Sequence, residues 1–158
     1  MPLDLPNGWT STPAPKGLGL TAKWLAAKDA RLSQNLLARS SEEAHALARQ
    51  LIKYCPEPTG ADKWLLPMET LRLKAGDCED WVLFTRALLI NGGIKPAILW
   101  LLIVDDLVTH QPHALLWTPR RFCDCRAPTV LEHSKFKDYR PIAAFNDSEA
   151  LTFGRRVA

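Results

Sequence analysis

The sequence lacks a long apolar run and any sign of an export signal. Its longest apolar run covers residues 97–104, which is too short to cross a bilayer. The first residues include neither a basic segment nor an apolar one, so we expect no signal peptide. These absences predict a cytoplasmic protein that does not associate with membranes, although packaging into a particle is an alternative.

The sequence also has little net charge and no disulfide pattern. The formal net charge is only +3 and the basic residues are scattered, so we expect no binding to nucleic acid. The four cysteines show no spacing typical of a small cross-linked domain: Cys55, Cys78, Cys123 and Cys125. A chain of 158 residues can bury a core without such cross-links, and we expect the thiols to be reduced.

Proline, glycine and apolar spacing divide the chain. Residues 1–19 are rich in proline and glycine and predict an extended arm, and residues 20–158 predict a single domain. The pattern over 20–54 is helical, with a second helix starting near Ser40 and His45 expected at the surface. A further helix over 78–91 is apolar almost all round, which predicts that it is buried.

After this helix the pattern changes to that of strands. Short apolar segments predict strands over 98–104, 107–109, 113–118, 121–126 and 139–145. Helices followed by a run of strands predict the α+β class, with an antiparallel sheet.

Cys78 is the first candidate for chemistry. Asp77 precedes it and is a good N-cap residue, which places Cys78 at the start of a helix. The positive end of the helix favours a thiolate there, as a nucleophile requires. The alternative is that Cys78 is a small, buried apolar residue without a chemical role.

His113 and Asp124 are candidates for the base and its orienting group. If Thr118 and Arg121 close a two-residue hairpin, His113 and Asp124 share one face and are diagonal neighbours. Cys123 and Cys125 then point to the opposite face. An activated cysteine needs this kind of support from a histidine and a carboxylate.

Four stretches within roughly residues 60–145 resemble those of the bacterial transglutaminase-like cysteine peptidases, in the papain-like and transglutaminase-like superfamily. They are Gly76–Asp80, Trp64–Leu71, His113–Leu116 and Phe122–Asp124. The resemblance implies N-terminal helices and a central helix, bearing the nucleophile, packed on an antiparallel sheet. It also implies a peptidase in which Cys78 attacks a protein or peptide substrate, His113 transfers the proton and Asp124 orients the imidazole.

The same resemblance suggests further site residues. The backbone N–H of Cys78 and the indole of Trp64 are the candidate oxyanion donors. One branch of the family binds calcium through acidic residues beside the nucleophile, and Asp77 and Glu79 match those positions. The alternative is that Asp77 only caps the helix and Glu79 only favours its dipole. No cofactor is otherwise expected.

Two departures leave alternatives open. Cys125 stands where the family has asparagine, and the chain is shorter than the exported members and resembles compact ones from phage and prophage genomes. This suggests packaging in a phage particle, with a partner bound through the N-terminal arm. The alternatives are an inactive structural or adaptor protein of the same fold, an acyl transferase, and a zinc site formed by His110, His113, Cys123 and Cys125.

Overall fold

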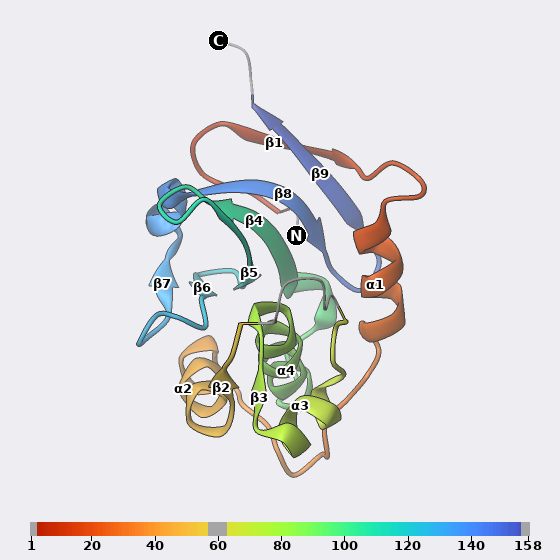
Figure 1. Cartoon of the computed structure of the whole chain (residues 1–158), viewed down its shortest axis with the longest axis vertical. Coiled ribbons are helices and arrows are strands. Elements are labelled where there is room, and N and C mark those ends of the chain that lie inside the picture. The colour runs from red at the N-terminus through yellow and green to blue at the C-terminus, as the bar shows by residue number, and fades with distance from the viewer. Residues whose placement is uncertain (1–2, 57–62, 156–158) are drawn as a thin grey trace.

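A single large sheet organises the chain. The computed structural model describes residues 3–56 and 63–155; parts of the predicted segments 1–19 and 20–158 lie outside these ranges. Within them, seven antiparallel strands form a sheet in the order β1-β9-β8-β4-β5-β6-β7. Figure 1 shows α2, α3 and α4 gathered on one side of this sheet, with α1 beside the start of β9.

Among the described residues, the α-helices all precede β4, and most of the sheet follows them. The elements are β1 Trp9–Pro13, α1 Gly19–Ala27, α2 Ser41–Leu51, β2 Lys53–Tyr54, α3 Pro67–Leu73, β3 Ala75–Gly76, α4 Cys78–Asn91, η1 Pro96–Ile98, β4 Trp100–Asp106, β5 Gln111–Trp117, β6 Arg121–Cys123, β7 Leu131–Glu132, η2 His133–Asp138, β8 Tyr139–Phe145 and β9 Ala150–Arg155. The predicted α+β class is confirmed, and the helix predicted over 78–91 has the bounds of α4.

The central strands are buried on both faces. Along β4, Leu101 and Ile103 belong to the core under the helices, whereas Leu102 and Val104 belong to a second core on the other face. Side chains of a strand alternate between the faces of a sheet, so a strand covered on both sides reads as a continuous apolar run. This second core, called the outer core below, also contains Leu5, Trp100, Leu115, Trp117, Phe122, Phe136, Tyr139 and Ala144.

The C-terminal end of α4 is held by an irregular segment. The Asn91 side chain donates hydrogen bonds to the carbonyl oxygens of Leu32, Ser33 and Leu36, at 3.3, 3.0 and 3.0 Å. The helical pattern predicted over 20–54 is therefore wrong over 28–39, because α1 ends at Ala27. The carbonyl groups of this segment bind α4 instead of continuing a helix of their own.

Part of the predicted N-terminal arm belongs to the sheet. Trp9–Pro13 forms β1 and pairs with β9, with Trp9 opposite Arg155. Leu5 is buried in the outer core. This segment is extended as the sequence predicts, but it forms an edge strand of the sheet instead of a free arm. A partner bound through the arm stays a prediction.

The connection between β4 and β5 is a turn. Asp106 accepts hydrogen bonds from the backbone N–H groups of Val108 and Thr109 at 2.8 and 3.2 Å. The short strand predicted over 107–109 is therefore wrong. The aspartate side chain offers the backbone a local turn in place of a strand.

Neither stretch of the chain that the structure describes contains a helix long and apolar enough to span a bilayer.

Candidate active site

The segment before α4 forms a closed turn around Cys78. Asp77 is the N-cap, and its Oδ1 accepts the backbone N–H of Asp80 at 3.0 Å. In return, Asp80 Oδ2 accepts the backbone N–H of Asp77 at 3.0 Å. This reciprocal capping box satisfies donors at the first turn and fixes the position at which Cys78 enters the helix.

Asp80 also ties a second segment to the helix. Its Oδ1 accepts the backbone N–H of Leu65 at 2.7 Å, which places the neighbouring Trp64 beside the start of α4. Gly76 has no side chain because a Cβ there would lie 2.7 Å from the Asp80 Cβ. The glycine and both aspartates of the signature stretch therefore have structural roles.

Cys78 is buried, and its thiol is hydrogen-bonded to Glu79. The side chain is 8 % exposed, and its Sγ donates a hydrogen bond to Glu79 Oε2 at 3.2 Å. Burial raises the pKa of the Cys78 thiol far above its ordinary value, and the carboxylates of Glu79 and Asp77 add to the shift. In this conformation burial and the two nearby acids oppose the thiolate that the helix start favours, so an activated Cys78 stays a prediction.

Two carboxylates meet beside this thiol. Burial, together with the nearby Asp77 carboxylate, raises the pKa of Glu79 to about 7. Carboxylate oxygens are the ligands that Ca²⁺ prefers, and a cation would relieve the repulsion between these two. The donor chemistry of Asp77 and Glu79 therefore fits a calcium ion, while Asp77 also caps the helix as the alternative holds.

His113 and Asp124 form a buried pair. His113 Nε2 and Asp124 Oδ1 are 2.8 Å apart, and the side chains are 3 % and 4 % exposed. The hairpin has the predicted register, with Leu116 opposite Cys123 and Trp117 opposite Phe122. A tight turn at residues 118–121 thus brings the histidine and the carboxylate together as the sequence predicts.

Asp124 has two further partners that the sequence did not reveal. Tyr139 donates its hydroxyl to Asp124 Oδ2 at 2.6 Å, and Arg126 Nη2 donates to the same oxygen at 3.1 Å. Burial alone would raise the pKa of Asp124, but the hydrogen bonds from His113, Arg126 and Tyr139 hold it well below its usual range. The carboxylate is therefore ionised and fixed in orientation.

Arg126 connects this group to the β4–β5 turn. Its guanidinium lies 2.8 Å from Asp106 Oδ2 while it also binds Asp124. Asp106 and Tyr139 are paired across β4 and β8, so the signal that could have revealed both residues was the pairing of these two strands.

Cys123 and Cys125 both lie in the core under the helices, and Cys125 also comes close to the histidine–aspartate pair. A ring nitrogen of His113, a carboxylate oxygen of Asp124 and the Cys125 sulfur all lie within 4.8 Å of one another. β6 ends at Cys123, and the backbone N–H of Ala127 bonds to the Asp124 carbonyl at 2.9 Å. The strand predicted over 121–126 is therefore too long, because the chain turns after Cys123.

The turn after Asp124 is anchored by α2. His45 Nε2 and Arg49 Nη1 contact the Ala127 carbonyl oxygen at 2.8 and 2.7 Å. His45 is 1 % exposed and packs edge-on against Trp81, so its predicted surface position is wrong. The alanines around it on α2 allow close packing against α4.

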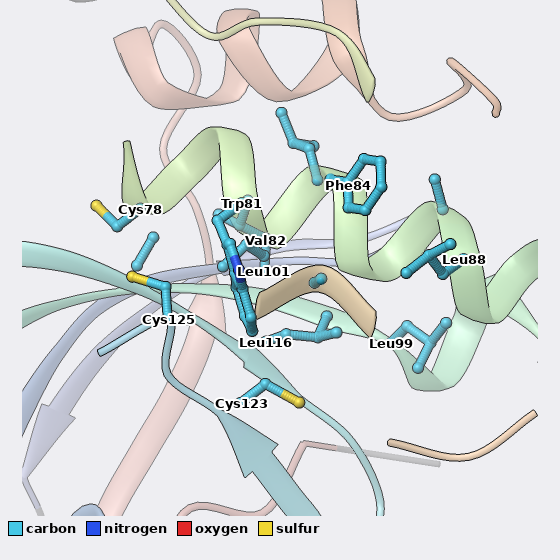
Figure 2. Close-up of a cluster of buried hydrophobic side chains, with 14 of the residues drawn as sticks. Cys78, Trp81, Val82, Phe84, Leu88, Leu99, Leu101, Leu116, Cys123 and Cys125 are labelled. Carbon is cyan, nitrogen blue, oxygen red and sulfur yellow. The ribbon is translucent and has the colours of Figure 1, made fainter. Parts of the chain in front are cut away.

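The zinc site predicted from sequence does not assemble as a set. His110 is exposed in the β4–β5 turn, and neither it nor Cys123 joins the group of ligand atoms around His113. Cys125 does join it. Figure 2 shows Cys78 at the first turn of α4, with Cys125 on the neighbouring segment and Cys123 farther along it.

Trp64 is buried, and its indole has no acceptor. The side chain is 7 % exposed, and among the described residues nothing accepts a hydrogen bond from its Nε1. A buried N–H group without a partner is uncommon, so this donor is available to a bound oxygen atom.

The fold is that of a transglutaminase-like domain. The family model with that description matches residues 30–116, more than half of the chain, so the protein belongs to this family. Comparison with curated protein sequences finds no match.

Solved structures show the same fold. "Legionella pneumophila LapG (EGTA-treated)" is 24 % identical, with a TM-score of 0.66 over 77 % of this chain and 75 % of that one. "Legionella pneumophila LapG (calcium-bound)" is 22 % identical, with a TM-score of 0.67 over 78 % of this chain and 76 % of that one. The predicted transglutaminase-like fold is therefore confirmed.

Proposed function

We propose that this protein is a thiol hydrolase, a cysteine peptidase acting on a protein or peptide substrate. The observation that carries the proposal is the buried pair of His113 and Asp124, with Nε2 and Oδ1 2.8 Å apart. Such a pair fixes the ring and its tautomer, so that the other nitrogen, Nδ1, is the proton acceptor. The similarity of this chain's fold to that of LapG supports the proposal.

In the proposed reaction Cys78 Sγ turns from Glu79 towards His113 and gives up its proton to the imidazole. The sulfur attacks the substrate carbonyl carbon, and His113 then donates the proton to the leaving amine. Water hydrolyses the resulting thioester after His113 takes one of its protons. Asp124 stabilises the imidazolium in both halves of the cycle.

The developing oxyanion has two proposed donors. The first-turn N–H groups of a helix have no intrahelical acceptor, so the backbone N–H of Cys78 can serve. The Trp64 indole N–H is buried and unpaired and is the second donor. Donors fixed in place before the reaction are worth several kcal/mol in such sites.

Asp77 and Glu79 are the proposed ligands of a calcium ion. When bound, the ion supplies fixed positive charge beside the first turn of α4. Engaging Glu79 in this way removes the acceptor that holds the Cys78 thiol. Asp77 keeps one oxygen on the Asp80 N–H, so the helix cap persists.

The test is alkylation by iodoacetamide, with the rate at each cysteine read by peptide mass spectrometry at pH 5–9, with and without calcium. We expect Cys78 to react faster than the half-buried Cys55 and His113→Ala to abolish that difference. Peptide cleavage by the wild type, and its loss in Cys78→Ala, identify the hydrolase. A Cys78 no more reactive than Cys55 under any of these conditions contradicts the proposal.

An inactive structural or adaptor protein is the second candidate. The hydrogen bond from Cys78 Sγ to Glu79 favours it, because a thiol held in this way is not a nucleophile. The alkylation rates separate the two candidates directly. If the wild type acylates an added amine instead of releasing an acid, acyl transfer replaces hydrolysis with the same three residues.

A further inference from the structure

Cys125 places a soft metal ligand beside the histidine–aspartate pair. Its sulfur belongs to a buried group of three ligand atoms, with His113 and Asp124, all within 4.8 Å of one another. Donor atoms around tetrahedral zinc are about 3.5 Å apart. A bound ion therefore requires these atoms to move from within 4.8 Å of one another to that spacing.

Asp124 is already saturated and suits an outer position. Its Oδ1 accepts from His113 and from the Arg126 backbone N–H, at 2.8 and 2.9 Å, and its Oδ2 accepts from Tyr139 at 2.6 Å. A histidine that binds a metal commonly donates its other N–H to a carboxylate. The bond between His113 Nε2 and Asp124 already has this form, and no described residue hydrogen-bonds Nδ1.

Cys78, the first residue of α4, is the candidate for a third donor. It shares a core cluster with Cys125, and the two are close enough for Cys125 to influence its ionisation. Figure 2 shows both sulfur atoms at the same end of α4. Its thiol is bonded to Glu79 in this structure, so binding a metal requires the side chain to rotate to another staggered rotamer.

We propose that Cys125 Sγ, His113 Nδ1 and Cys78 Sγ form a binding site for Zn²⁺ or a similar transition-metal ion, with Asp124 as the hydrogen-bond partner of His113. Each thiol releases its proton on binding, which leaves two thiolates around a doubly charged ion. This unit is neutral, and a buried site tolerates it better than an isolated charge. The fourth position is open to water or to a substrate atom.

This site is distinct from the acidic pair at Asp77 and Glu79. Thiolate and imidazole select zinc and related ions, whereas carboxylates select calcium. Metal binding itself does not depend on the proposed peptidase function. Its consequence does: the ion occupies the nucleophile and the base together and so inhibits the enzyme.

The test uses Co²⁺ as a spectroscopic substitute for zinc in the purified, reduced full-length protein. We expect one equivalent to bind, with tetrahedral d–d bands and a thiolate-to-cobalt charge-transfer band, and zinc to displace it. Cys125→Ser should weaken binding at least tenfold, and Cys78→Ser should reduce the charge-transfer band. Cys123→Ser is the matched control, because Cys123 is buried two residues away but lies outside the group, and it should bind as the wild type does.

A second measurement keeps the proposal testable if a variant fails to fold. In the wild-type protein, zinc should slow alkylation of Cys125 and Cys78 while Cys55 reacts unchanged. Cobalt spectra without a thiolate band, equal binding by Cys125→Ser, or no protection by zinc would each overturn the proposal. Failure of the peptidase test leaves these readouts intact, because none of them measures turnover.

Discussion

Tyr139 and Asp124 are joined by a 2.6 Å hydrogen bond, although the strands that lead to them are separated by β4 and β5 in the sheet. Arg126, which follows β6, completes the group by binding both Asp124 and Asp106, the last residue of β4. The orientation of Asp124, and through it that of His113, is therefore set by strands that carry no proposed catalytic residue.

Removing this hydroxyl should destabilise the fold. We expect Tyr139→Phe to lower the free energy of unfolding by about 1.5–3 kcal/mol, because a buried donor to a charged oxygen is lost. Urea denaturation measures the change. Tyr54→Phe is the control, because no described residue hydrogen-bonds that hydroxyl, and it should cost much less. Equal losses in the two variants would show that the bond to Asp124 contributes nothing.

The charge of Asp124 should make part of the stability depend on pH. Its pKa is lower in the folded state than its ordinary value, so its contribution is complete above the unfolded pKa of about 3.9. It is lost as the pH falls towards the folded pKa. The wild type should therefore exceed Asp124→Asn in stability at pH 7, and the difference should shrink below about pH 4. A difference that is constant from pH 7 to pH 3 would contradict this assignment.

Asp80 should hold the Trp64 segment on α4. Asp80→Ala removes the capping partner of Asp77 and the acceptor of the Leu65 N–H, which should cost about 1–3 kcal/mol. Amide exchange at Leu65 should become faster in this variant. The control is Asp138→Ala, at an exposed position, which should change neither quantity. Unchanged exchange at Leu65 would mean that the segment is held by packing alone.

The contact at the other end of α4 should tolerate no side chain. A Cβ at Gly92 would lie 1.8 Å from the Ala38 carbonyl oxygen, so we expect Gly92→Ala to cost at least about 2 kcal/mol through displaced backbone. Gly19→Ala is a matched control in α1, where a Cβ meets nothing within 4 Å. It should be neutral or stabilise the protein by about 0.5–1 kcal/mol. Thermal unfolding of both variants decides the point.

The sequence predicted best where local pattern and burial agree. The bounds of α4 follow from the Asp77 cap and from the glycines after Asn91, and those of β8 follow from a short apolar segment. All of these are local features. The proximity of His113 and Asp124 followed from a hairpin of two residues, because a tight turn fixes the register of the strands beside it. These features need no knowledge of distant contacts.

The misses involve contacts between segments far apart in the chain. Residues 28–39 have helical spacing, but their carbonyl groups bind Asn91, which nothing in that segment indicates. The strand predicted over 121–126 ends at Cys123, because a turn follows that the local pattern does not mark. The buried position of His45 depends on its packing against Trp81 of α4. In each case tertiary packing overrode a local preference.

The pairing of β1 with β9 constrains how the sheet is completed. Thr10 bonds to the carbonyl oxygen of Gly154 across 144 residues of sequence, so this edge closes a loop of nearly the whole described chain. Pairing between residues so far apart in the sequence is slow to form, because closing the intervening loop costs conformational entropy. During synthesis on the ribosome, β8 is thus an open edge until β9 emerges, and an open edge invites pairing with other chains. Aggregation of nascent or truncated chains should begin at β8, even though the site-bearing strands lie on its other side.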